Sequence, residues 1–171
     1  MVQAVLEGRK TMTRRVVKKN IVDWLPTLSD ISQAGIRKNG LCPYGYAGDR
    51  LWVRETFLID GPYIQYRADH PDAPKETTWK PSIFMPRSAS RILLEITDVR
   101  VERLWDISEE DAAAEGVQKA FGPNWVNYLE NNYTCESAVA SFLSLFALIN
   151  GLELLSENPW IWVITFKRIE P

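Results

Sequence analysis

The fold of this 171-residue chain is constrained most by two long segments of alternating apolar side chains, residues 91–104 (RILLEITDVRVERL) and residues 158–169 (NPWIWVITFKRI). The period of two predicts β-strands, and a change of phase near Asp98 in the first segment predicts a bulge or bend. The second segment begins apolar on both faces, which is typical of a strand that is covered on both sides. We therefore expect a sheet that curls into a small barrel closed by the last strand.

Shorter extended segments complete the predicted sheet, which is mostly antiparallel. They lie at residues 14–19, 48–59 and 63–69, and at residues 80–90. The last of these carries two prolines, which cannot donate to a strand ladder, so we expect it to be an edge or irregular strand.

Helical signals mark three places, so that the fold class is α+β with helices flanking the sheet. A short helix covers residues 1–8 and ends at Gly8. Ser108 is the N-cap of a second helix, with Asp111 as its partner three residues on. The third helix, residues 135–151, is longer. Its apolar stripe consists of Val139, Phe142, Leu143 and Phe146.

Length and composition indicate a single domain over residues 1–171. Hydrophobic residues make up 46% of the chain and charged residues 25%, which is ordinary for a globular protein and argues against disorder. Between about residues 20 and 46 there is no clean period, and prolines and glycines recur. We predict an irregular insertion there.

Several classes of protein are disfavoured by the sequence. No apolar run approaches the roughly 18 residues that span a bilayer, and the N-terminal segment is too polar for a signal peptide. We therefore expect a cytoplasmic protein that does not bind membranes, with Cys42 and Cys135 as reduced thiols. The single histidine, His70, lies in a proline-rich stretch, so we expect no metal site and no cofactor.

The segment GRKTMTRR, residues 8–15, is strongly basic although the net charge of the chain is −2. It places Lys10 three residues before Thr13. A threonine hydroxyl needs a neighbouring base to act as a nucleophile, and a lysine amine is such a base only where burial or nearby cations lower its pKa. The nearby cations are Arg9, Arg14 and Arg15. A solvated basic turn is the simpler alternative.

The pattern Gly8-x-Lys10-x-x-Thr13-x-Arg15 resembles the signature of the ASCH domain family, whose fold is a PUA-like β-barrel. Two further segments, AGDRLWVRE and NPWIWVITFKRI, are similar to the turn and strand that follow the motif and to the closing strand. The resemblance covers most of the chain and is close to ASCH-type proteins encoded in prophage regions. The family resemblance therefore implies the same curled sheet that the strand pattern predicts.

Three departures from the family pattern stand out. Relatives of this type usually carry an apolar strand before the segment that begins here at Met1, which leaves the oligomeric state open, with a homodimer as one option. Ser88 stands where an aromatic residue is usual, and Phe84 replaces a polar residue. These two differences concern the pocket wall and its ligand.

Some ASCH proteins remove the acetyl group from N4-acetylcytidine with a threonine, a lysine and a glutamate. The resemblance implies Thr13 as the nucleophile or the group that positions water, Lys10 as its base, and Glu115 as the proton carrier. The leading hypothesis is therefore a metal-free hydrolase that acts on a modified nucleoside or RNA. The structural alternative is an ion pair between Lys10 and Glu115, with Thr13 as an ordinary strand residue.

Other members of the family are described as RNA-binding modules or ribonucleases, and both remain alternatives. In either, cations would contact phosphates and aromatic rings would stack on bases. The candidate ligand contacts are Gly8, Arg9, Arg14, Arg15, Trp52, Arg54, Arg87 and Arg91. Trp160 and Trp162 are expected in the core instead.

Overall fold

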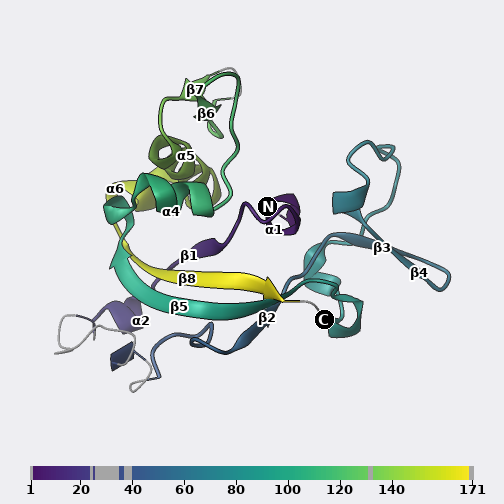
Figure 1. Cartoon of the computed structure of the whole chain (residues 1–171), viewed down its shortest axis with the longest axis horizontal. Coiled ribbons are helices and arrows are strands. Elements are labelled where there is room, and N and C mark those ends of the chain that lie inside the picture. The colour runs from purple at the N-terminus through teal and green to yellow at the C-terminus, as the bar shows by residue number, and fades with distance from the viewer. Residues whose placement is uncertain (1, 24, 26–34, 37–39, 131–132, 170–171) are drawn as a thin grey trace.

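The computed structural model describes residues 2–23, 25, 35–36, 40–130 and 133–169 (Figure 1). Its centre is an antiparallel sheet of four strands in the order β1–β8–β5–β2. The strands are β1 (Met12–Val16), β2 (Arg50–Trp52), β5 (Leu93–Arg103) and β8 (Trp160–Ile169). The long strands β5 and β8 curl together, so the sheet forms a half-barrel (Figure 1). The predicted α+β class, with an antiparallel sheet and flanking helices, is confirmed.

The paired strands β5 and β8 form the backbone of the sheet. Their register steps from Ile96 opposite Phe166 to Asp98 opposite Thr165, so an extra residue is accommodated in β5 between the two pairs. This is the bulge that the change of phase predicts. Residues 161–164 of β8 are at most 1% exposed, which confirms that the last strand is covered on both faces. It does not close a barrel, however, because it lies between β1 and β5 inside an open half-barrel.

Alternate residues of β8 enter two different cores. Ile161 and Val163 pack with Met12 of β1 and with the phenylalanines of a long helix, α5 (Ala138–Asn150). Trp162 and Ile164 pack on the opposite face against residues from the segment between β1 and β2. The described members of that second cluster include Val17, Leu25, Ile36 and Cys42. Residues 24, 26–34 and 37–39 of the predicted insertion lie outside the described residues.

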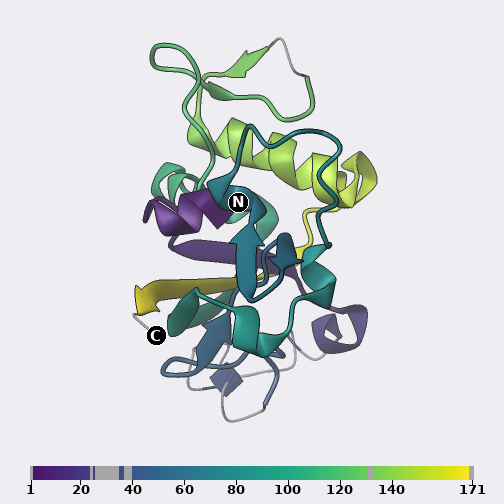
Figure 2. The same cartoon turned by 90° about the vertical axis from the view of Figure 1, so that its right-hand side faces the viewer.

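The helices lie mainly on one side of the sheet, as the side view shows (Figure 2). They are α1 (Val2–Leu6), α4 (Glu109–Ala114), α5 and α6 (Leu152–Ser156), whereas α2 (Lys19–Val22) lies on the other side (Figure 1). The Ser108 hydroxyl accepts from the main-chain nitrogen of Asp111 at 3.1 Å, which confirms the predicted helix start. Phe142 and Phe146 of the predicted stripe are buried. No helix in the described part of the chain has the length and apolar character needed to cross a membrane.

Two small hairpins project from the central sheet. One joins β3 (Phe57–Asp60) to β4 (Tyr63–Tyr66), and the other joins β6 (Trp125–Val126) to β7 (Thr134–Cys135). The predicted strand over residues 48–59 is therefore divided, because β2 ends at Trp52 and β3 begins in a different sheet.

The predicted strand at residues 63–69 ends at Tyr66, because Arg67–Asp69 form a 3₁₀ turn. The predicted strands at residues 14–19 and 80–90 also need correction. The first is shifted toward the N-terminus, since β1 ends at Val16 and Lys19 already belongs to α2. The second forms two 3₁₀ turns, Ser82–Phe84 and Arg87–Ala89, with one isolated bridge from Lys80 to β3. A proline precedes each turn, and its fixed φ and missing N–H favour a turn over a strand ladder.

Candidate active site

A cavity of about 590 Å³ lies between β1, α1, α5 and the residues that follow β2. Its lining includes Lys10, Thr13 and Glu115, the three residues of the predicted catalytic group. Four of the predicted ligand contacts line the same cavity, namely Arg14, Arg15, Trp52 and Arg54. The apolar part of the wall comes from α1, α5 and strands of the sheet, and includes Phe142 and Phe146 of α5.

Main-chain hydrogen bonds fix the segment that carries Lys10. The nitrogen of Lys10 donates to the carbonyl of Ala4 in α1 at 2.8 Å, and the nitrogen of Thr11 donates to the carbonyl of Ala114 in α4 at 2.9 Å. Glu115 directly follows that helix as its C-cap residue. The turn between α1 and β1 is thus held against the end of α4, which brings Lys10 and Glu115 together although 105 residues separate them.

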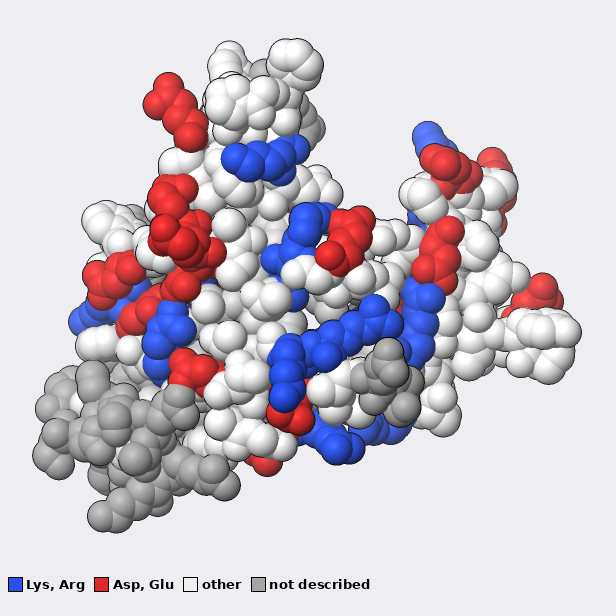
Figure 3. Space-filling view, in the orientation of Figure 1, with Lys and Arg blue, Asp and Glu red and all other residues white. Residues whose placement is uncertain are grey.

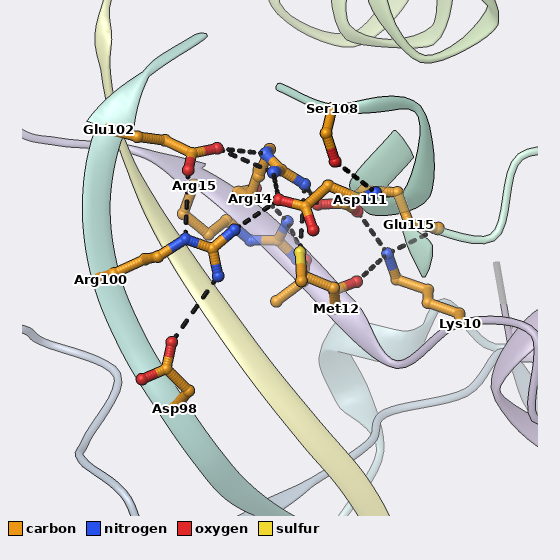
Figure 4. Close-up of polar contacts among 11 residues, drawn as sticks. Lys10, Met12, Arg14, Arg15, Asp98, Arg100, Glu102, Ser108, Asp111 and Glu115 are labelled. Atoms are coloured by element: carbon orange, nitrogen blue, oxygen red, sulfur yellow. Dashed lines mark hydrogen bonds and ion pairs between the residues drawn. The ribbon is translucent and has the colours of Figure 1, made fainter. Parts of the chain in front are cut away.

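The ammonium group of Lys10 is surrounded by acceptors (Figure 4). Its Nζ donates to Oε2 of Glu115 at 2.6 Å, to the Glu115 carbonyl at 2.8 Å and to the Met12 carbonyl at 2.8 Å. The Lys10 and Glu115 side chains are only 6% and 3% exposed. An ammonium has three hydrogens, so these acceptors engage all of them. The ion pair of the structural alternative is therefore present.

Burial and charge act on Lys10 in opposite directions. Removal from water lowers its pKa and is the largest influence, whereas the carboxylate of Glu115 raises it. Arg15 and Arg14 add smaller lowering effects because like charges disfavour the ammonium form. The net result is a pKa below the ordinary value of a lysine, so less free energy is needed to form the neutral amine.

Thr13 lies on β1 between two buried residues and has a partly exposed side chain. Its hydroxyl oxygen accepts a hydrogen bond from Nη1 of Arg15 at 2.8 Å. The same nitrogen of Arg15 also donates to the carbonyl of Arg14. A cationic donor is thereby fixed beside the one hydroxyl of the predicted catalytic group, where it would favour a developing negative charge.

Arg14 has a different environment from Arg15. Its side chain is 1% exposed, and Nη2 donates to Asp111 at 2.7 Å and to Glu102 at 2.8 Å. Nη1 lies 3.5 Å from the second carboxylate oxygen of Glu115. Arg14 therefore connects the Lys10–Glu115 pair with the carboxylates of β5 and α4 (Figure 4).

Arg100 extends this network toward the surface. It contacts Asp111, Glu102 and Asp98, and the surface above α4 is rich in acidic side chains (Figure 3). Sequence reasoning missed Arg100 and Glu102. The signal was available, because Arg100 and Glu102 are two apart on a predicted strand and so share one face.

A second group of charges surrounds Trp52. The guanidinium carbon of Arg54 lies 4.8 Å from the centroid of the indole, and that of Arg87 lies 5.5 Å from it. Arg54 also donates to the carbonyl of Ile83 at 3.3 Å. Trp52 therefore holds two cations beside the cavity that it lines.

The remaining predicted contacts lie elsewhere. Gly8 has φ of +73° just after α1, a conformation that glycine adopts at little cost. Arg9 pairs with Glu7 and lines a separate open cavity of about 600 Å³ beside the end of α4. Arg91 pairs with two carboxylates, the buried Glu55 and the more exposed Asp69, at distances of 3.0 and 2.6 Å. Neither arginine lines the cavity that contains Lys10.

The chain was compared with protein-family models, with curated proteins and with solved structures. None of the three comparisons finds a match.

Proposed function

We propose that this chain is an ASCH-type hydrolase that removes an acyl group from the exocyclic amine of a modified pyrimidine nucleoside. The observation that carries the proposal is the shared cavity of about 590 Å³, which Lys10, Thr13 and Glu115 line together. A volume in this range suits a small-molecule site. The resemblance of the Gly8–Arg15 segment to the ASCH signature supplies the reaction class.

In the proposed reaction the Thr13 hydroxyl attacks the carbonyl carbon of the acyl group. Neutral Lys10 takes the hydroxyl proton, and the Arg15 guanidinium, 2.8 Å from the Thr13 oxygen, favours the negative charge that develops. The bond from carbon to nitrogen breaks, and the leaving amine takes up a proton from Glu115. Water then hydrolyses the threonyl ester, which releases the carboxylic acid and restores the hydroxyl.

The proposed reaction needs a neutral Lys10 and a proton donor, and the contact of 2.6 Å between Lys10 and Glu115 provides a path for one proton between them. Transfer of one proton from Lys10 to Glu115 produces a neutral amine and a neutral carboxylic acid in a single step. Burial lowers the pKa of Lys10, which favours the loss of its proton. In the proposed reaction Lys10 is the base and Glu115 carries the proton to the leaving amine.

The experiment is to incubate the purified protein with N4-acetylcytidine and to follow the release of acetate and cytidine. Wild type should hydrolyse the substrate, and Thr13→Val, Lys10→Met and Glu115→Gln should each reduce the rate by about 100-fold or more. Arg9→Gln is the matched control, because Arg9 lies outside the cavity. Unfolding curves of each variant separate loss of chemistry from loss of fold. A Thr13→Val rate equal to that of wild type would contradict the assigned nucleophile.

A non-catalytic RNA-binding module is the second candidate. It is favoured by the three acceptors that engage every hydrogen of the Lys10 ammonium, since such a lysine serves as a structural tie between α1, β1 and α4. On this alternative N4-acetylcytidine stays intact, and the protein retards RNA in a way that weakens steeply with added salt.

A further inference from the structure

The arginines that the sequence predicts as ligand contacts fall into two classes according to their partners. Arg9, Arg14 and Arg91 are each paired with at least one carboxylate. Within the described part of the chain, no ion pair joins Arg15 or Arg54 to a carboxylate. The positive charges of these two guanidinium groups, which line the cavity, are therefore not offset by a carboxylate.

Arg87 adds a third unneutralised cation beside Trp52, although Arg87 itself does not line the cavity. It makes no ion pair in the described residues, and its guanidinium lies over the same Trp52 ring that Arg54 contacts. The indole restricts both side chains by cation–π contact, so they are placed before any ligand arrives. Two cations held on one ring repel each other, and an anion that binds to both would offset that repulsion.

The position of these cations relative to the reacting group restricts the anion. Arg15 contacts both the Thr13 hydroxyl and the cavity, and Arg54 and Trp52 line the same cavity. A substrate whose acyl group lies at Thr13 can therefore place an anionic group beside these cations.

We propose that Arg15, Arg54 and Arg87 form a phosphate subsite, in which Trp52 positions Arg54 and Arg87, so that the substrate is a nucleotide unit and not a free nucleoside. This inference rests on the proposed function for the identity of the base. Arginine binds phosphate oxygens with paired, charge-assisted hydrogen bonds, which makes it well suited to this ligand. The phosphate is the 5′-monophosphate of a free nucleotide or a phosphodiester of a strand.

The test is calorimetric binding to the Thr13→Val variant, in which hydrolysis is blocked. Four ligands are compared: N4-acetylcytidine, its 5′-monophosphate, a short single-stranded RNA with an internal N4-acetylcytidine, and the same RNA with cytidine. The phosphate should strengthen binding by about tenfold or more over the nucleoside. A gain with the mononucleotide assigns the subsite to a terminal phosphate, and a gain only with the acetylated RNA assigns it to a phosphodiester. The proposed subsite is overturned if N4-acetylcytidine binds as tightly as both its 5′-monophosphate and the acetylated RNA.

Substitutions of single arginines show which residues produce the gain in affinity from the phosphate. Arg54→Gln and Arg87→Gln should each remove most of it while leaving the affinity for the nucleoside within about twofold. Arg9→Gln, which changes a carboxylate-paired arginine outside the cavity, should leave the gain intact. A gain that survives both Arg54→Gln and Arg87→Gln contradicts the proposal. Binding is measured without turnover, so its result is independent of the hydrolysis assay. The phosphate subsite can therefore be supported or contradicted even if the protein does not hydrolyse acylated cytidine.

Discussion

Arg14 and Arg15 are neighbours on β1, yet they belong to two regions with opposite electrostatic character. Arg14 points to the side on which β5 and α4 supply Glu102 and Asp111, and its side chain is 1% exposed. Arg15 points the other way, is exposed, and contacts the Thr13 hydroxyl. The same residue type is thus a structural tie in one position and an unneutralised cation in the next. A basic segment can therefore contain arginines of two kinds. The carboxylates that surround each arginine have to be known before that arginine is assigned to a ligand.

The strongest test of this comparison is a matched pair of substitutions. Arg14→Met should reduce the free energy of unfolding by about 3–5 kcal/mol, because it leaves buried and half-buried carboxylates without their cation. Arg15→Met should change it by no more than about 0.5 kcal/mol, as expected for an exposed position. Urea unfolding of both variants measures the two effects. Equal losses for the two variants would break the comparison.

The local part of the fold could be predicted from the sequence. Alternation identified β5 and β8, the change of phase located the bulge near Asp98, and the cap signal located the start of α4 at Ser108. Each of these signals acts between residues that are close in the chain. Such features depend on backbone geometry and local hydrogen bonds more than on distant partners.

The division of the arginines could not be predicted in the same way. Arg14 meets Glu102 and Asp111 across 88 and 97 residues of chain, and those contacts depend on the curl of the sheet. The division of the predicted strand over residues 48–59 also involves other parts of the chain, because β2 pairs with β5 and β3 pairs with β4. The buried Glu55 between them pairs with Arg91. The meeting of Lys10 with Glu115 was expected from family resemblance and not from spacing.

Two glycines near Lys10, Gly116 and Gly8, offer a second comparison with a smaller expected effect on stability. A Cβ on Gly116 would lie 2.8 Å from the Cβ of Lys10 and 2.9 Å from that of Ala4, and its φ is +84°. Gly116→Ala should therefore cost about 2–4 kcal/mol through both crowding and strain. Gly8 has a similar φ of +73°, but a Cβ there would meet no atom within 4 Å, so Gly8→Ala should cost only about 1–2 kcal/mol of strain. Thermal unfolding of the pair measures the difference, and a larger loss at Gly8 would contradict the packing around Lys10.

The proposed reaction depends on a neutral amine from the buried Lys10–Glu115 pair. The most direct measurement is an NMR titration of the Lys10 side chain in wild type and in Glu115→Gln. Because burial outweighs the carboxylate, the pKa of Lys10 should lie below its ordinary value of 10.5 in wild type. It should fall further in Glu115→Gln, since that change removes the group that raises it. A wild-type pKa at or above 10.5 would contradict the account and leave Lys10 as a structural cation.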